Sequence, residues 1–137
     1  MTGAIHPAER VWIEGEPKDP RDIRVGDRID TVGPRRRRVE KVTRGSGRGT
    51  VWLYGASGAC IRCLRDQRVQ VSVGGRTRFR RAEKIKPGEF LLGLVSGRLC
   101  VDPVVAIRTL EEAVPAIYLE IPPVSLISAE GLVTRPS

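Results

Sequence analysis

The stretch Ile23-Arg24-Val25-Gly26-Asp27 has a similar stretch later in the chain, Ile85-Lys86-Pro87-Gly88-Glu89. Each reads as an apolar residue followed by a turn, with a glycine and an acidic residue before the next strand. Two further segments are repeated in the same order: Val39–Val42 returns as Val104–Ile107, and Val51–Tyr54 returns as Ile117–Glu120. Three repeats in register indicate two similar β-halves related by a pseudo-two-fold axis; generic β patterning is the alternative.

The rest of the chain predicts short strands separated by turns. Fifteen glycines and ten prolines lie between short apolar runs, which favours strands over long helices. Gly74-Gly75 and Ser96-Gly97 are hairpin signals, and only Arg81–Ile85 could form a helical turn before a proline. The 137 residues, 40% of them hydrophobic, suffice for one domain with a core. We predict an all-β fold, with a flexible N-terminal tail over residues 1–10 that holds the single histidine, His6, and one β domain over residues 11–137.

The positive charge of the chain comes mainly from arginine. The formal net charge is +8, and only four of the 24 basic residues are lysines: Lys18, Lys41, Lys84 and Lys86. Arginine binds phosphate and carboxylate groups bidentately, so the charge could serve nucleic acid or an acidic partner. Solvated or acid-paired arginines are the alternative, since aromatic residues are few and no recognised nucleic-acid motif is present. The candidate contact residues are Arg35, Arg36, Arg37 and Arg38 in one run, and Arg76, Arg78 and Arg80 on one face of a strand.

Three cysteines, Cys60, Cys63 and Cys100, are too few for a disulfide scaffold. The Cys60-x-x-Cys63 pair lacks the second pair of ligands that a zinc site usually takes, so we predict buried, inert thiols and neither metal nor cofactor. No apolar run approaches the roughly 20 residues of a membrane span, and the N-terminus lacks the regions of a signal peptide. We therefore expect a protein without membrane contact, made in a reducing cytoplasm and kept there or packed into a particle assembled there.

Five segments of the chain, taken in order, resemble the blocks of a known superfamily. Asp22–Asp27 is similar to an early block in which an apolar residue precedes Gly-Asp, and Cys60–Val69 to a block carrying Thr-x-x-His. Arg81–Leu91 is similar to a later block with Ala, Leu or Ile, and Gly-Asp, while Ile117–Ile121 and Leu126–Ser137 are similar to the closing strands. Over residues 11–135 the chain thus resembles the Hint (hedgehog/intein) superfamily. The resemblance implies a disc-like all-β fold built from two related halves.

The resemblance also implies a self-cleavage chemistry whose residues this sequence lacks. The family uses an N-terminal Cys or Ser nucleophile, a Thr-x-x-His pair and a terminal His-Asn whose Asn cyclises. Here no cysteine precedes Cys60, no serine precedes Ser46, and the sequence contains no asparagine. Leu64-Arg65-Asp66-Gln67 stands in place of Thr-x-x-His, and Arg135-Pro136 in place of His-Asn. We therefore assign no catalytic residue and predict that the chain is not an enzyme.

The sequence thus predicts a non-catalytic Hint-like domain with a structural or assembly role. By analogy, degenerate domains of this kind resemble accessory pieces of phage particles, which suggests a tail or head component of a virion. Its partners would be proteins of a larger assembly, and oligomeric copies fit that role. The alternatives are a basic nucleic-acid-binding protein and a residual cysteine-dependent autoprocessing domain.

Overall fold

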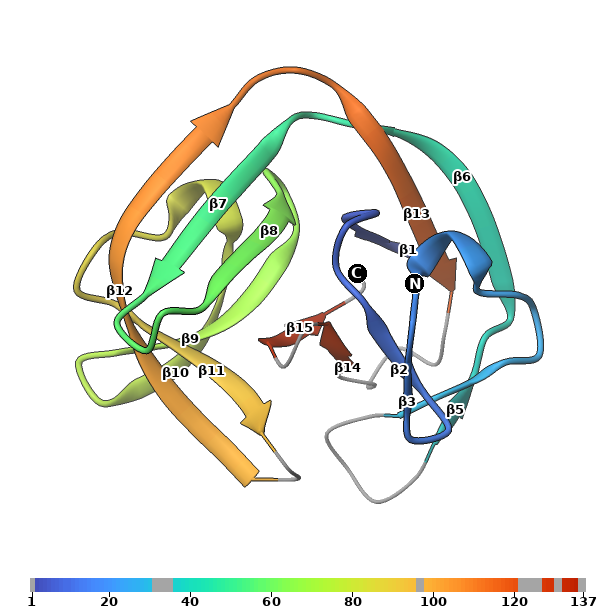
Figure 1. Cartoon of the computed structure of the whole chain (residues 1–137), viewed down its shortest axis with the longest axis horizontal. Coiled ribbons are helices and arrows are strands. Elements are labelled where there is room, and N and C mark those ends of the chain that lie inside the picture. The colour runs from blue at the N-terminus through green and yellow to red at the C-terminus, as the bar shows by residue number, and fades with distance from the viewer. Residues whose placement is uncertain (1, 31–35, 96–97, 121–126, 130–131, 136–137) are drawn as a thin grey trace.

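The computed structural model consists of antiparallel strands and two single-turn 3-10 helices, which confirms the all-β prediction (Figure 1). It describes residues 2–30, 36–95, 98–120, 127–129 and 132–135, of which 2–4, 93–95, 98–100, 127–129 and 132–135 by backbone alone. The strands up to the first long crossing are β1 (Thr2–Ile5), β2 (Val11–Ile13), β3 (Glu16–Lys18), β4 (Arg28–Ile29), β5 (Arg37–Arg38), β6 (Lys41–Gly47) and β7 (Thr50–Gly55). The later strands are β8 (Cys60–Leu64), β9 (Arg68–Val73), β10 (Arg76–Arg81), β11 (Phe90–Val95), β12 (Arg98–Leu110), β13 (Val114–Glu120), β14 (Ile127–Ala129) and β15 (Leu132–Arg135). The two 3-10 helices are η1 (Pro20–Asp22) and η2 (Ala82–Lys84).

The repeated Ile-x-x-Gly-acid stretch builds the same turn twice, once after each 3-10 helix. Gly26 and Gly88 adopt φ values of +94° and +93°, a conformation that glycine reaches at little cost. The hydrogen bonds correspond one to one: Gly26 N to Val39 O and Gly88 N to Val104 O, both 2.9 Å; Arg24 N to Asp27 Oδ2, 2.9 Å, and Lys86 N to Glu89 Oε1, 2.8 Å. The repeat seen in the sequence is therefore a structural repeat, and each acidic side chain closes its own turn.

The two halves exchange their long strands. β6 pairs with β13 and β7 pairs with β12, so each ribbon joins an early strand to a late one. Val42 lies opposite Leu119 in one ribbon, and Ile107 lies opposite Leu53 in the other. In Figure 1 both ribbons arch over the top of the molecule, with β1 to β6 and β13 on one side and β7 to β12 on the other. The second half, β7 to β12, is therefore one continuous piece of chain, whereas the first half combines β1 to β6 with the distant strand β13.

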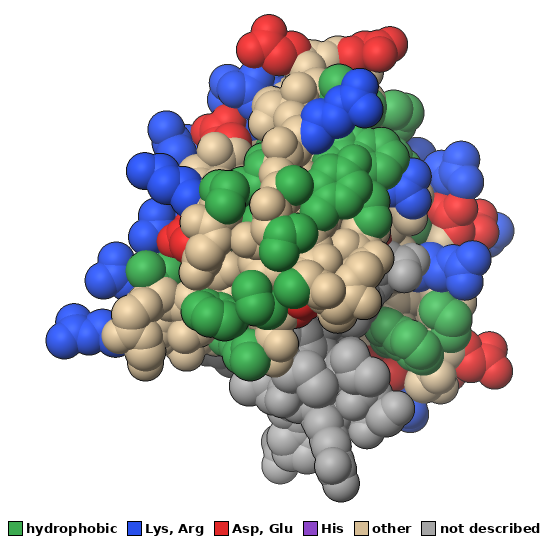
Figure 2. Space-filling model, turned by 60° about the vertical axis from the view of Figure 1, so that its left-hand side comes forward, with side chains coloured by type: hydrophobic (Ala, Val, Ile, Leu, Met, Phe, Trp, Pro, Cys, Tyr) green, Lys and Arg blue, Asp and Glu red, His purple; other side chains and the backbone are tan. Residues whose placement is uncertain are grey.

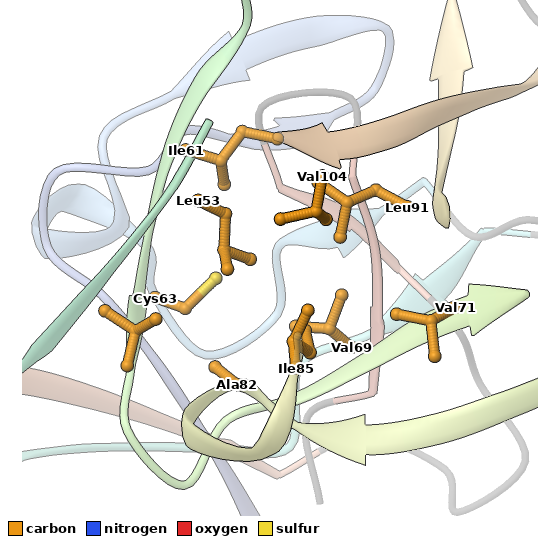
Figure 3. Close-up of a cluster of buried hydrophobic side chains, with 10 residues drawn as sticks. Leu53, Ile61, Cys63, Val69, Val71, Ala82, Ile85, Leu91 and Val104 are labelled. Atoms are coloured by element: carbon orange, nitrogen blue, oxygen red, sulfur yellow. The ribbon is translucent and has the colours of Figure 1, made fainter. Parts of the chain in front are cut away.

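Each half buries its own hydrophobic cluster. The first contains Ile5, Val11, Ile23, Ile29, Val39, Ile117 and Leu119. The second contains Val51, Leu53, Ile61, Cys63, Val69, Val71, Ala82, Ile85, Leu91 and Val104, whose labelled side chains converge on one interior in Figure 3. The repeat and the strand registers match the clusters residue by residue: Ile23 with Ile85, Val39 with Val104, Leu119 with Leu53, and Ile5 with Cys63. We call two residues related in this way counterparts.

The N-terminal residues are part of the domain, whereas the sequence predicts a flexible tail over residues 1–10. β1 pairs with β13 along its length, and Ile5 is fully buried opposite Ile117. β1 covers the edge of β13 as β8 covers the edge of β7, so the pseudo-symmetry itself requires an additional strand here. An isolated four-residue strand gives little signal in sequence, because its stability comes from the edge it covers.

Two predicted hairpins are present. Gly74 and Gly75, with φ values of +58° and +78°, connect β9 to β10, as expected of a tight turn that needs two left-handed residues. β11 and β12 pair up to Val95 opposite Arg98, while the turn residues Ser96-Gly97 lie outside the described part of the chain. The helical turn predicted over Arg81–Ile85 is η2.

Candidate functional site

The closing hairpin β14–β15 lies where the two halves meet. Ala129 of β14 pairs with Val11 of β2, and Thr134 of β15 pairs with Val69 of β9. Val11 and Val69 are counterparts, so the hairpin spans the pseudo-two-fold axis, between the two lobes of Figure 1. Such a central position, reached by strands of both halves, is where distant sequence blocks can meet.

The hairpin brings together the positions at which the resemblance would place the cleavage residues. Arg135 pairs with Arg68, the residue after Gln67, so the end of β15 runs beside the segment aligned with Thr-x-x-His. Pro136 lies outside the described residues. The fold therefore assembles the two substituted blocks in one place.

The Gln67 side chain is hydrogen-bonded to the backbone beside this meeting point of the two blocks. Its side chain is 3% exposed, and its Oε1 accepts a hydrogen bond from the backbone N–H of Leu64 at 3.2 Å. Leu64, in the position of the threonine, is fully buried. A carboxamide does not titrate near neutral pH, so Gln67 stabilises the turn but supplies no acid or base.

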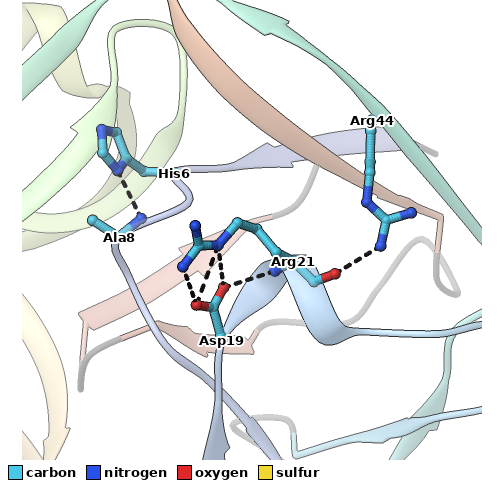
Figure 4. Close-up of polar contacts among 5 residues, drawn as sticks. All are labelled: His6, Ala8, Asp19, Arg21 and Arg44. Atoms are coloured by element: carbon cyan, nitrogen blue, oxygen red, sulfur yellow. Dashed lines mark hydrogen bonds and ion pairs between the residues drawn. The ribbon is translucent and has the colours of Figure 1, made fainter.

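His6 is buried in the domain, not placed in a mobile tail. Its Nε2 lies 3.0 Å from Thr50 Oγ1, and its Nδ1 accepts a hydrogen bond from the backbone N–H of Ala8 at 3.1 Å, a contact drawn in Figure 4. Burial, and secondarily the charge of Arg62, lower the pKa of His6 to about 4. The imidazole is therefore neutral at physiological pH, with both ring nitrogens engaged.

Glu9 is a second buried polar residue that the sequence does not single out. It is 2% exposed, its Oε1 accepts a hydrogen bond from the backbone N–H of Arg62, and the Arg62 Nε lies 3.6 Å from the same oxygen. Glu9 thus satisfies the outer edge of β8. It is the counterpart of Gln67, since Glu9 N donates to His6 O as Gln67 N donates to Leu64 O, both at 3.1 Å. Extending the sequence repeat upstream would have found this pair.

The three cysteines differ in their surroundings. Cys63 is fully buried, and desolvation, followed by the nearby charge of Glu9, raises the pKa of its thiol. Cys60 is exposed on β8, which differs from the predicted burial, and Cys100 is described by backbone alone. Among the described residues, no three His, Cys, Asp or Glu side chains are grouped so that they could hold a metal ion. In the same part of the chain, no helix is long and apolar enough to cross a membrane.

The first arginine run is not a uniform basic surface. Arg35 lies outside the described residues. Arg36 Nε lies 2.6 Å from Asp30 Oδ1, so its charge is neutralised, and Arg37 is half-buried opposite Ile29. Arg38 of β5, which lies opposite Arg28 of β4, is exposed. The run is split between an ion pair and a short edge strand.

The second arginine group lies along β10. Arg76, Arg78 and Arg80 stand opposite Val73, Val71 and Val69 of β9, so they share one face of the sheet. Arg80 Nε lies 3.1 Å from the nearly buried carboxylate of Glu89. Arg76 and Arg78 are exposed, and two of the three side chains could therefore meet a partner.

Comparisons with known proteins assign the fold. No family profile matches this sequence, and no curated protein is similar to it. The structure is similar to that of a DnaB intein from Synechocystis sp. PCC 6803, with a TM-score of 0.81 and 15% identity over 100% of this chain and 99% of that one. It is also similar to the gp41-1 intein, with a TM-score of 0.77 and 17% identity over 97% and 98% of the two chains.

A bacterial intein-like domain from Clostridium thermocellum gives the same picture, with a TM-score of 0.77 and 16% identity over 98% of this chain and 99% of that one. The three similarities cover nearly the whole length of every chain, so the described strands form one intein-like domain without a large insertion or deletion. The predicted Hint fold is confirmed. Identities this low show the fold alone and leave the chemistry to the residues of this chain.

Proposed function

We propose that this Hint-fold domain neither splices nor cleaves itself and serves as a structural or assembly module that binds another protein. The observation that carries the proposal is the pairing of β15 with β9, which brings Gln67 and Arg135 together in place of the family's His and His-Asn. A buried carboxamide and a guanidinium cannot act as a general base near neutral pH, and Pro136, which stands in place of the cyclising asparagine, has no side-chain amide.

His6 does not replace the missing base. Both of its ring nitrogens are engaged, and its pKa of about 4 makes it a weak base at pH 7. Nor does Cys63 replace the missing nucleophile, because a buried thiol with a raised pKa holds its proton. These groups are accounted for by packing and hydrogen bonding within the fold.

The exposed side chains support a protein partner. Phe90, Val101, Val105 and Leu110, on β11 and β12, are 41%, 60%, 58% and 38% exposed. On the face shown in Figure 2, hydrophobic side chains occupy the middle, and basic side chains interspersed with acidic ones lie along the left, upper and right margins. An apolar centre with a charged rim is the arrangement of a protein–protein interface.

A fusion experiment tests the absence of cleavage. The domain is placed between two folded reporter proteins, and the products are followed by intact mass after incubation with and without dithiothreitol and hydroxylamine, which release thioesters and esters. We expect only the full-length fusion. The gp41-1 intein in the same fusion is the positive control, and a fragment or ligated product from this chain would overturn the proposal. Loss of such a product in a Cys60→Ala variant would instead support the cysteine-dependent alternative.

Membership of a phage virion, as a tail or head accessory protein, rests on the resemblance and on the assembly role proposed above. It predicts that the protein, made in the host cytoplasm, sediments with purified particles at a fixed number of copies per particle. A protein that stays entirely in the unassembled fraction would exclude this location and leave the non-catalytic binding role to be tested separately.

Nucleic-acid binding is the second candidate, favoured by the exposed Arg76 and Arg78 on β10. It predicts an affinity for duplex DNA that falls steeply with salt concentration. Replacing both arginines by alanine would then lower the affinity and flatten the salt dependence by about two phosphate contacts. A salt-insensitive or undetectable affinity would exclude this candidate.

A further inference from the structure

An open hollow of about 620 Å³ lies in the first half, between the turn that follows η1 and strand β6. Its lining consists of three arginines, one aspartate and three aliphatic residues: Arg21, Arg24, Arg44, Asp22, Ile23, Val25 and Val42. Its volume is in the range of sites that bind small ligands.

The arginines of the hollow are unequal. The Arg21 guanidinium donates two hydrogen bonds to the Asp19 carboxylate, from Nε to Oδ1 at 3.0 Å and from Nη2 to Oδ2 at 2.6 Å (Figure 4). The charge of Arg21 is therefore already neutralised. Arg44 Nη2 donates a hydrogen bond to the backbone oxygen of Arg21 at 2.7 Å, which holds the Arg44 guanidinium at the rim. Arg24 and Arg44 form no ion pair with any carboxylate of the described residues. Two cationic groups are thus available to a ligand.

The aliphatic side chains give the hollow an apolar wall. Val25 is 60% exposed, although it is a branched aliphatic residue in a turn. Val42 is half-buried beside it, and Ile23 continues into the buried cluster of the first half. A ligand that covered Val25 would remove apolar surface from water, which favours binding.

The second half of the molecule shows that the fold does not need the side chains of Val25 and Arg44. The same turn there carries Lys86 and Pro87 at the positions of Arg24 and Val25. Arg44 lies opposite Ile117, and its counterpart Thr109 lies opposite Val51, so the second half has a threonine in place of that arginine. A basic residue is therefore common to the two turns, whereas the exposed Val25 and the guanidinium of Arg44 are found in the first half alone of the two.

We propose that this hollow is a docking site for an extended acidic segment of a partner protein. Carboxylates of the segment pair with Arg24 and Arg44, and a branched aliphatic side chain between them packs on Val25 and Val42. The proposal rests on the binding role proposed above and names the kind of partner. A nucleic-acid backbone fits less well, because the aliphatic residues separate the cations of the lining and offer a phosphate chain no partner.

Fluorescence anisotropy with three labelled peptides tests the proposal. The probe is Glu-Leu-Glu-Val-Glu, and the comparison peptides are Gln-Leu-Gln-Val-Gln, which lacks the charges, and Glu-Gly-Glu-Gly-Glu, which lacks the apolar side chains. We expect the probe to bind more tightly than both. The double variant Arg24→Ala with Arg44→Ala should lose roughly tenfold in affinity, as two ion pairs at a partly exposed site would.

A charge-matched control separates the hollow from the general basicity of the protein. The double variant Arg76→Ala with Arg78→Ala removes the same charge from β10 and should bind the probe within about twofold of the unmodified protein. Val25→Ser should weaken the binding of the leucine-containing probe but not that of the glycine peptide. Thermal unfolding of each variant shows that it is folded.

Three outcomes would overturn the docking site: equal losses in the two double variants, equal binding of the three peptides, or no binding of the probe by the unmodified protein. Single-stranded DNA could also displace the probe as effectively as unlabelled probe does. If both double variants lost the binding of this DNA, the result would indicate a general polyanion surface instead. A failure here, with the reporter fusion intact, leaves the non-catalytic function standing. Cleavage of that fusion would overturn the function whatever the peptides do.

Discussion

For single residues, the pseudo-symmetry gives pairs of side chains that occupy the same backbone environment and can be compared directly. His6 is the counterpart of Leu64, Glu9 of Gln67, and Ile5 of Cys63. In each pair the backbone is the same while the side chain differs in polarity. Where the counterpart of a polar or reactive residue carries no reactive group, packing alone accounts for a side chain at that position. Ile5, the counterpart of Cys63, is an example.

His6 makes the stability of the domain depend on pH. Its pKa of about 4 in the folded state is below the ordinary value of 6.5, so the unfolded chain takes up the proton first as the pH falls. The free energy of unfolding should fall by about 2 kcal/mol between pH 7 and pH 5, a range in which most carboxylates remain ionised.

Urea denaturation at the two pH values measures this change, and the variant His6→Leu, which copies Leu64, is the control. The variant lacks the titrating group, so its loss of stability between pH 7 and pH 5 should be much smaller. If both proteins lose the same free energy, His6 is not the group responsible.

Cys63 is a core residue, and we expect its thiol to be unreactive. Cys63→Val should cost less than about 1.5 kcal/mol, because the cluster accepts an aliphatic side chain of similar volume. Cys63→Ser should cost about 2–3 kcal/mol, since it buries a hydroxyl without an assigned partner. Urea denaturation measures both values. An equal effect of the two variants, or rapid modification of Cys63 by a thiol reagent in the folded protein, would contradict a core role.

The sequence predicts the burial of a residue best where its polarity follows the alternation of a strand or the geometry of a turn. The buried Val and Ile residues of the strands follow from alternation, and Gly26 and Gly88 follow from the repeated turn. The burial of His6 and Glu9 could not be predicted in this way, because polar residues enter a core only where specific partners such as Thr50 and the Arg62 backbone N–H satisfy them. Those partners come from strands distant in sequence.

At the element scale, the crossing from β6 to β7 is the place where the chain passes from one half to the other. Gly49, between these strands, has φ of +91°, and a Cβ atom there would lie 2.4 Å from the backbone oxygen of Leu110 at the end of β12. Here the glycine is required by both backbone conformation and close approach. Pairings between strands this far apart in sequence slow the folding of a domain, because a long loop must close before they form.

Replacing Gly49 by alanine should therefore destabilise the domain more than the same change at Gly88. Both glycines have nearly the same φ, but a Cβ on Gly88 meets nothing within 4 Å. Gly88→Ala should cost about 1 kcal/mol, from backbone strain alone. Gly49→Ala should cost at least about 2 kcal/mol more, because the backbone of Leu110 must move.

The free energy of unfolding of both variants, from urea titration, decides the comparison. Similar values for the two would mean that β12 yields easily at this point and that the crossing is not tightly packed. The exchange of strands itself was not predictable from the sequence. The repeated segments indicate two halves, but only the registers of β6 with β13 and of β7 with β12 reveal which half each strand joins.

At the scale of the whole molecule, the exchanged strands tie the two hydrophobic clusters into one cooperative unit. Unfolding the first cluster removes β13 from β6, and because β13 continues the chain of β12, it also disturbs the ribbon that covers the second cluster. A single domain of this size is expected to unfold in one transition. A tryptophan on each side of the pseudo-two-fold axis makes this measurable: Trp12 in β2 and Trp52 in β7, where Trp52 stacks on Tyr54 with 6.4 Å between ring centroids.

The variants Trp12→Phe and Trp52→Phe each leave one fluorescent reporter, in the second and the first half respectively. In each variant the urea midpoint from tryptophan fluorescence should coincide with the midpoint from circular dichroism, because the reporting half cannot unfold alone. Comparing two probes within one variant removes the effect of the substitution on stability, including the loss of the Arg62 guanidinium contact, 5.1 Å from the Trp52 ring. Separate midpoints within either variant would mean that the halves unfold independently and that the shared ribbons do not couple them.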